Sequence, residues 1–468
     1  MTTTATPHLP TALPPGPTGP GLLQVLKFVR TPYRFMDDCR ARHGDTFTVR
    51  FPGQPPIVVC GDPDALSWLA TAGYEQCTRQ ADNARFILGD ASILFRQDDQ
   101  HRSLRRLMTP PFHGERMRDC GTDIAAIADA RFARWRPGET VALMDEIEAI
   151  TLRVIVRCIF GIDEHRVEQL ERDILGYLHG ISKPWYYAGS LLLSGPRVRG
   201  FVRSFMPAAG RRRPWRLQTA EHLAGFEAGL VEEVRRCRAM PADALGRRRD
   251  VLSMLASARF DDGSEFGEEE LKDHLMTMLL AGYNASAITA CWAVHDLLSH
   301  PEALSRLREE VCGVEERAFD PGRLRDVPYL TAAMNESMRY HPLAPWVVRK
   351  LKQPAVFAGH PLPAGAQVAP CIYLAHRDPR LWPDPDRFQP DRFLSGRITS
   401  QQFMPFGLGV WRCLGAPFAE YMVKVMLYRL FARFELEPEA GVTIRPVLSG
   451  IAVAPSHGMP VRVVRRLY

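Results

Sequence analysis

One short loop near the end of the chain constrains its fold and chemistry more than any other segment. Residues 406–415 read FGLGVWRCLG, so three glycines surround the thiol of Cys413. Glycine permits tight turns and a close approach of the backbone to a ligand. Residues 416–435 are apolar at helical spacing, which predicts that Cys413 lies just before a helix N-terminus. Because that end of a helix favours a thiolate, the loop is suited to bind a soft metal or a haem iron.

The composition of the chain excludes several other classes of protein. Of its 468 residues, 46% are hydrophobic and 24% are charged, as in globular proteins with a large core. The net charge of +6 is too small to indicate nucleic-acid binding. The ten cysteines form no Cys-x-x-Cys pair, which argues against a disulfide framework or a zinc site and favours a reducing cytoplasm.

The first residues of the chain carry no targeting pattern. Residues 1–21 are rich in Thr and Pro, and no charged segment is followed by an apolar run, so we expect neither a signal peptide nor a membrane anchor. We interpret residues 1–21 as a flexible, proline-rich lead-in and residues 22–468 as one domain. The apolar stretch at 275–298 is interrupted by polar residues, which predicts a buried helix and not a membrane span.

A lone cysteine is more often a small buried apolar side chain, so other segments must support the loop. Residues 101–112 read HRSLRRLMTPPF and place His101 and Arg105 on one face of a helix. Such a face can hold carboxylates through charge-assisted hydrogen bonds, although a solvated basic face has the same pattern.

A long helix is predicted over residues 268–299, where three glutamates begin an apolar run. At ~1.5 Å per residue it would extend ~48 Å, enough to cross the domain. Its centre reads AGYNAS, from Ala281 and Gly282 through Asn284 to Ser286. A small-residue helix crossing is the simplest interpretation of these residues.

Residues 327–342 read VPYLTAAMNESMRYHP and contain Glu336 and Arg339 at a spacing that allows an ion pair on a helix. Alone, this pair would indicate only a weak surface contact. Two arginines lie in later Pro-Asp-Arg-Phe segments, Arg387 and Arg392.

Together these four segments resemble the motifs of the cytochrome P-450 family, in the same order and along nearly the whole chain. The resemblance implies a mainly α fold with a small β region, arranged as a triangular, helix-rich single domain. It also implies a haem b cofactor whose iron is bound by Cys413. The loop residues expected around the haem are Phe406, Gly407, Trp411, Arg412 and Gly415.

The resemblance assigns roles outside the loop as well. The residues expected to bind the haem propionates are His101, Arg105 and Arg349. Glu336 and Arg339 are expected to form a buried structural cluster with Arg392, which we favour over Arg387. The residues expected to line the substrate pocket are Leu343, Ala344, Trp346 and Val347, and the apolar segment 177–205 is expected to form its lid.

Two positions depart from the family pattern. Where family members carry an acid followed by Thr, this chain has Asn284 and Ala285, and Ser286 keeps the second hydroxyl of the family pattern. Neither an amide nor a methyl group can pass a proton as a carboxylate does. Trp411 stands where an Arg or His usually faces a propionate. Ala281, Gly282, Asn284 and Ser286 are therefore the candidate catalytic residues of the long helix.

The resemblance implies a monooxygenase that oxidises an apolar small molecule, such as a terpenoid or polyketide of secondary metabolism. Dioxygen would be the co-substrate, and a separate ferredoxin or flavodoxin with its reductase would supply electrons. A haem-thiolate isomerase, dehydratase or oxidative-coupling enzyme is the alternative that the missing acid-Thr pair leaves open. A non-catalytic haem sensor or carrier is another. Peroxide-driven fatty-acid hydroxylation is disfavoured, because the Arg-Pro pair of such members is absent from the long helix.

Overall fold

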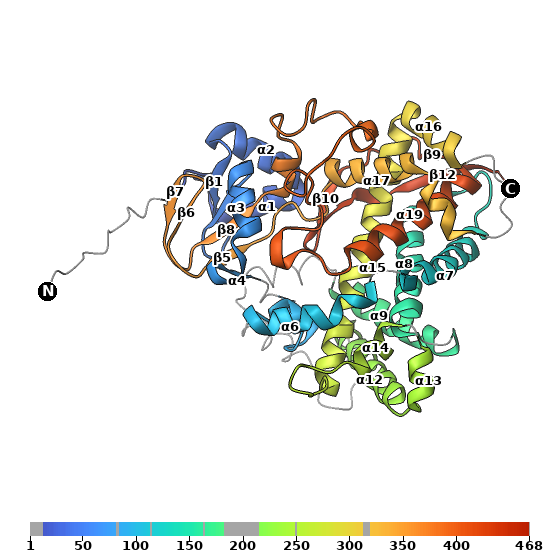
Figure 1. The fold of residues 1–468 in the computed structure, drawn as a ribbon. Coiled ribbons are helices and arrows are strands. Elements are labelled where there is room, and N and C mark those ends of the chain that lie inside the picture. The colour runs from blue at the N-terminus through green and yellow to red at the C-terminus, as the bar shows by residue number, and fades with distance from the viewer. Residues whose placement is uncertain are drawn as a thin grey trace.

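The computed structural model describes residues 13–80, 84–112, 115–161, 164–181, 215–248, 250–311 and 319–467, and the statements below concern these residues. Figure 1 shows a larger, helix-rich part and a smaller part that contains β1, β2, β5 to β8 and the first helices. The fold is therefore mainly α with small β-sheets, as the sequence predicts.

The helices vary in length from one turn to about nine turns. They are α1 (Gly21–Arg30), α2 (Pro32–His43), α3 (Pro63–Thr71), α4 (Gly73–Gln76), α5 (Arg85–Leu88), α6 (Asp98–Met108), α7 (Glu115–Phe132), α8 (Leu143–Phe160), α9 (Glu164–Ile181), α12 (Trp215–Arg238), α13 (Ala242–Arg247), α14 (Val251–Ser257), α15 (Glu268–Ser299), α16 (Pro301–Val311), α17 (Pro328–Tyr340), α18 (Ile372–His376) and α19 (Ala416–Arg433).

The strands are short and belong to four sheets. They are β1 (Thr46–Val49), β2 (Ile57–Cys60), β3 (Cys77–Arg79), β4 (Thr140–Ala142), β5 (Arg349–Leu351), β6 (Ala355–Phe357), β7 (His360–Leu362), β8 (Gln367–Pro370), β9 (Phe434–Pro438), β10 (Pro446–Ser449), β11 (Ala452–Pro455) and β12 (Pro460–Arg466).

The five-stranded sheet has the order β1-β2-β8-β5-β3 and brings together segments that are far apart in the sequence. β1 and β2 form the antiparallel hairpin that the Pro/Gly turn at 52–56 predicts. At the other edge, β3 pairs antiparallel with β5, and the register sets Arg79 directly opposite Arg349. This edge of the sheet therefore carries two guanidinium groups side by side.

α15 occupies the centre of the helical part and packs against α8, α12, α17 and α19 (Figure 1). Its bounds are those predicted from the sequence. Small side chains allow the close approach of α8, because a Cβ on Gly282 would lie 2.9 Å from Ile155 Cδ1. Further along the helix, Ala287, Ala290 and Ala293 are fully buried.

The segment before α1 lies along the sheet. The Thr48 N–H donates to the Pro15 carbonyl oxygen at 3.0 Å, and the Thr48 hydroxyl donates to that of Pro14 at 2.7 Å. The Gln24 side chain donates to the Gly19 carbonyl oxygen at 2.9 Å. These contacts attach residues 14–19 of the predicted lead-in to β1 and α1.

Two sequence predictions concern the surroundings of the domain. The predicted lid, residues 177–205, lies outside the described residues beyond residue 181. Among the helices that the structure describes, none combines the length and apolar composition needed to span a bilayer.

Candidate active site

The Cys413 loop is closed by its own backbone. The Cys413 N–H donates to the Phe406 carbonyl oxygen at 2.8 Å. Gly407 and Gly409 have φ angles of 77° and 61°, in the region that favours glycine. A Cβ on Gly409 would lie 2.5 Å from the Ala70 carbonyl oxygen, so α3 packs directly against the loop. The loop conformation therefore depends on these two glycines.

Cys413 is the only exposed cysteine among the described residues, and α19 begins three residues after it. One side of the thiol is open, yet the protein packed around it desolvates the group and raises its pKa. The Gly415 N–H and the guanidinium groups of Arg105 and Arg79 act in the opposite direction. These donors and the positive end of α19 would stabilise the sulfur as a thiolate when it binds a metal.

A cluster of three arginines and one histidine lies beside the loop. Its members are Arg79, His101, Arg105 and Arg349. Arg79 donates to the Trp411 carbonyl oxygen at 3.0 Å, and Arg105 donates to the Arg412 carbonyl oxygen at 2.7 Å. The Arg349 guanidinium lies 4.7 Å from the centre of the Trp411 ring. These four side chains come from β3, α6 and β5, and all of them lie beside the Cys413 loop.

The positive charges of this cluster are not neutralised by the protein. Desolvation first, and neighbouring cations second, lower the pKa of Arg349 to about 9 and that of Arg79 to about 10. The same causes lower the pKa of His101 to about 4, and its Nδ1 lies 2.6 Å from the Tyr74 hydroxyl. In the described part of the chain, no carboxylate forms an ion pair with any of these four side chains. A ligand with carboxylates of its own would supply the missing partners.

These residues fit a haem. The exposed sulfur of Cys413 suits its iron, and the desolvated arginines suit its propionates. Trp411 is buried, and its indole Nε1 has no hydrogen-bond partner in the protein. Trp411 thus stands where family members usually carry a charged propionate ligand, and its ring instead contacts the guanidinium of Arg349. Arg412 is exposed and contributes its backbone carbonyl to Arg105.

Sequence reasoning missed Arg79. It lies in a three-residue strand with no motif around it, within a segment of mixed pattern. Only the pairing of β3 with β5 places its guanidinium beside Arg349. The signal that could have found it is a basic residue in a short strand next to the predicted propionate site.

Comparisons with known proteins show the family of the chain. The Cytochrome P450 family profile matches residues 14–460. Cytochrome P450 135B1 of Mycobacterium tuberculosis is 34% identical over 454 residues, which cover 96% of this chain and 91% of that protein. Cytochrome P450 138 of the same organism is 32% identical over 467 residues, or 99% of both chains. The chain belongs to the cytochrome P450 family.

The fold is shared with a solved structure as well. The retinoic acid-bound structure of cyanobacterial CYP120A1 matches with a TM-score of 0.81 at 22% identity, over 98% of this chain and all of the other. As a cytochrome P450, this protein is an enzyme of the monooxygenase class with a haem-thiolate cofactor. Its activity involves a substrate, dioxygen and a redox partner.

The centre of α15 in this P450 presents small side chains to open space. Ala281 is exposed and Ala285, one turn later, is half-buried. Ser286 is only 3% exposed and points into the core, so its hydroxyl does not replace the missing Thr. Gly282 faces α8 instead of the open side. Of the four candidate catalytic residues, only Ala281 therefore faces the open side of the helix.

Asn284 is held by a carboxylate that the sequence motif did not reveal. Its side-chain amide donates to Glu148 Oε1 of α8 at 2.7 Å. Desolvation raises the pKa of Glu148, and Asp145 adds to the rise, while the bond from Asn284 lowers it. An acid is thus present beside position 284, but it belongs to a different helix.

Glu336 and Arg339 are fully buried, and the side chain of Arg392, which reaches Glu336, is 11% exposed. Arg339 donates to both oxygens of Glu336 at 2.7 and 2.9 Å, and Arg392 Nε lies 3.3 Å from Glu336 Oε1. Arg339 also donates to the carbonyl oxygens of His376, Pro385 and Arg387. Arg387 itself is exposed. The side chain that reaches Glu336 is that of Arg392, the one favoured from the sequence.

The residues predicted to line the substrate pocket do not all face one chamber. Leu343 packs with Ile288 and Trp292 of α15. Trp346 instead stacks on Phe28 of α1, with ring centres 4.6 Å apart. Val347 packs against a third group, which includes Leu66 of α3 and Leu408.

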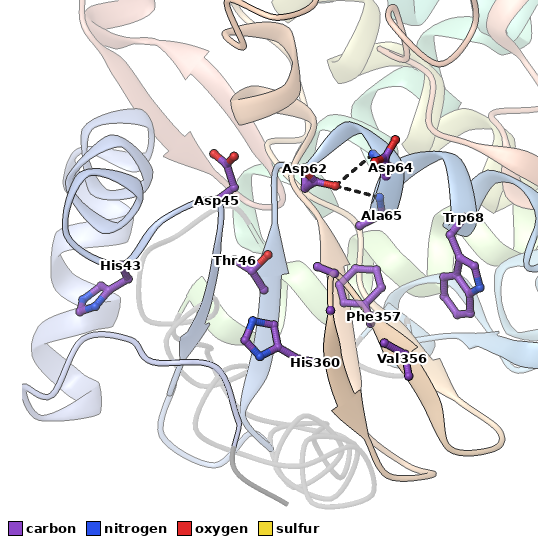
Figure 2. A pocket seen from close by; sticks show the side chains of 12 residues that line it. His43, Asp45, Thr46, Asp62, Asp64, Ala65, Trp68, Val356, Phe357 and His360 are labelled. Atoms are coloured by element: carbon purple, nitrogen blue, oxygen red, sulfur yellow. Dashed lines mark hydrogen bonds between the residues drawn. The ribbon is translucent and has the colours of Figure 1, made fainter. Parts of the chain in front are cut away.

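A separate groove of about 550 Å³ lies between α3, the start of β1 and the β6–β7 hairpin (Figure 2). Trp68, Phe357 and Val356 form its apolar side. Two of its three carboxylates have partners in the protein: Asp62 caps α3, and Asp45 pairs with Arg40 at 2.7 Å. The groove shares no residue with the Cys413 loop, so it is not the active site.

Proposed function

We propose that this P450 is a cytoplasmic monooxygenase that hydroxylates or similarly oxidises an apolar small molecule, such as a terpenoid or polyketide. The observation that carries the proposal is the apolar surface that α15 presents, with Ala281 exposed and Ala285 half-buried. Half-buried Leu343 and Val347 follow α17 on the way to Arg349. A surface of small and aliphatic side chains binds hydrocarbon and excludes water from it.

When bound, the haem supplies the chemistry of dioxygen activation, and the thiolate ligand donates electron density to the iron. The chain contributes the rest. Cys413 would hold the iron, and Arg79, Arg349, Arg105 and His101 would orient the propionates. The small side chains of Ala281 and Ala285 would leave room for the substrate.

The electron donor in this proposal is a ferredoxin or flavodoxin with its reductase. Arg105 and Arg412 lie next to Cys413, and Arg412 is exposed. An acidic partner would be attracted to such a surface, close to the proposed ligand of the iron.

A spectrum of the reduced, CO-bound protein tests the haem-thiolate assignment. We expect an absorption maximum at about 450 nm, the expectation for a thiolate ligand, and its loss in Cys413→Ala. An apolar ligand library should then yield compounds that change the spin state of the iron. Turnover of a hydroperoxide without any reductant would instead identify an isomerase or dehydratase. A thiolate spectrum with neither ligand response nor turnover would identify a haem carrier.

A further inference from the structure

α1 exposes three leucines to solvent. Leu22, Leu23 and Leu26 have 56%, 52% and 42% of their surface exposed, while Gln24 and Phe28 bury the opposite side of the helix. At 100° per residue, Leu22 and Leu26 lie on one stripe, and Leu23 flanks it. A contiguous apolar surface of this kind marks a site of interaction.

The charged side chains on α1 itself are all basic. Residues 21–36 contain Lys27, Arg30 and Arg34 and no acidic residue, and the first carboxylates that follow are Asp37 and Asp38 of α2. All three basic side chains are exposed. Arg30 continues the stripe of Leu22 and Leu26, and Lys27 lies one turn after Leu23. Long basic side chains at the border of an apolar face can extend to anionic headgroups while the leucines enter the acyl layer.

A mainly apolar pocket of about 190 Å³ lies beneath the helix. The apolar residues that line it are Val25, Phe28, Val29, Phe51, Ile57, Trp346 and Val348. The polar residues that line it are uncharged glutamines, Gln54, Gln80 and Gln367. Val348 directly precedes Arg349, which lies over Trp411 of the Cys413 loop. The pocket thus extends from α1 to the strand that carries a proposed propionate ligand.

The β10–β11 turn adds to this side of the molecule. β10 lies beside α1 and α2, and Ile451 in the turn after it is 84% exposed. The exposed apolar side chains of α1 and this turn are all aliphatic. Protein interfaces, in contrast, are enriched in aromatic anchors, so the composition favours lipid over protein.

We propose that α1 docks on the surface of an anionic lipid bilayer. Leu22, Leu23 and Leu26 enter the acyl layer, and Lys27 and Arg30 contact the headgroups. This docking places the pocket beneath α1 next to the acyl layer of the bilayer, in which apolar compounds dissolve. The docking itself does not depend on catalysis, whereas the uptake of a substrate from the bilayer rests on the proposed function.

Sedimentation of the haem-loaded protein with lipid vesicles tests the proposal. We expect binding to vesicles of phosphatidylcholine with about 30% phosphatidylglycerol, and weaker binding without the anionic lipid or at high salt. The double variant Leu22→Ser/Leu26→Ser should reduce binding about 10-fold or more under all conditions. Lys27→Gln/Arg30→Gln should reduce it mainly at low salt.

Val356→Ser is the matched control. Val356 is 62% exposed on β6, at the groove of Figure 2, and its replacement should leave vesicle binding unchanged. Failure of the wild-type protein to sediment would overturn the proposal, as would an equal loss in the Val356 variant. Light scattering that shows a dimer dissolved by Leu22→Ser/Leu26→Ser would assign the surface to a second copy instead. The CO spectrum is recorded on each variant, so loss of the haem site and loss of lipid binding are distinguished.

Discussion

At the scale of single residues, Arg79 and Arg349 are both proposed to bind the haem propionates. They lie 270 positions apart in the sequence but directly opposite each other in the sheet. Both are desolvated and neither has a carboxylate partner in the described chain. We predict that Arg79→Ala and Arg349→Ala each speed haem release about 10-fold, since a hydrogen bond to a charged group contributes about 1.5–3 kcal/mol. Transfer of haem to an apo-globin scavenger measures the rate. Lys350→Ala, an exposed neighbour on β5, should leave it unchanged.

The sequence alone predicts Arg349 as a propionate ligand but gives no indication of Arg79. Arg349 follows a recognisable pattern after the Glu336 helix, and His101 and Arg105 lie in a helix with a characteristic ending. Arg79 acquires its position only through the register of two strands from opposite ends of the chain. Glu148 was missed for the same reason, because its contact with Asn284 depends on the packing of α8 against α15.

We propose that the carboxyl group of Glu148 donates protons to the active site in place of the acid that the family motif usually carries. Its carboxyl accepts from Asn284, and desolvation raises its pKa toward the range of a proton donor. We predict that Glu148→Gln keeps the contact with Asn284 but lowers the product formed per reducing equivalent about 100-fold, the lower end of the usual range for general acids. Haem content should not change.

Two readouts separate a proton-transfer role of Glu148 from a structural one. The solvent isotope effect on turnover should increase in Glu148→Gln, whereas a packing defect would leave it as in the wild type. Glu302→Gln, the same substitution at an exposed position of α16, serves as the control. Unchanged product yield in Glu148→Gln would contradict the assignment.

At the scale of elements, the cluster at the end of α17 joins this helix to the 3₁₀ turn η5 (Pro390–Phe393). Glu336 keeps its bidentate pair with Arg339 when Arg392 is removed, so the change costs one hydrogen bond to a charged group, about 1.5–3 kcal/mol. We predict a loss of about 2 kcal/mol for Arg392→Ala. Arg387→Ala should cost about 0.5 kcal/mol or less, since that side chain is exposed. Denaturant unfolding of the haem-loaded protein measures both.

The elements that the sequence predicts well are those with long regular patterns. The bounds of α15 follow from its acidic start and its apolar run, and the β1–β2 hairpin follows from its turn. The three-residue strands β3 and β5 have no such pattern, because three residues carry too little periodicity. Their existence depends on each other and on β8.

At the scale of the whole molecule, one buried histidine next to the Cys413 loop makes the free energy of unfolding depend on pH. His376 accepts from the Met404 N–H at 3.1 Å, two residues before Phe406. Burial, with Arg339 as a further cause, lowers the pKa of His376 from 6.5 to about 3. Between these values the unfolded chain binds a proton that the native protein does not. The free energy of unfolding therefore falls as the pH is lowered through this window.

Denaturant unfolding between pH 7 and pH 4 checks this dependence. One proton contributes up to about 1.4 kcal/mol per pH unit. We predict that His376→Asn has a smaller pH slope than the wild type, at a lower overall stability. His457→Asn, which alters an exposed histidine, should retain the wild-type slope. An identical slope in His376→Asn would assign the acid sensitivity to other groups.

The register of β3 against β5 has a consequence for the assembly of the molecule. Like charges directly opposite each other destabilise a strand pair, and here Arg79 faces Arg349 at the edge of the five-stranded sheet. A haem that neutralises both would act as a counterion for this strand pair. The edge of the sheet should then be the last part of the fold to become rigid, with amide hydrogen exchange in residues 77–79 slowed by haem far more than exchange in β1 and β2. In this view the prosthetic group completes a β-sheet as well as an active site.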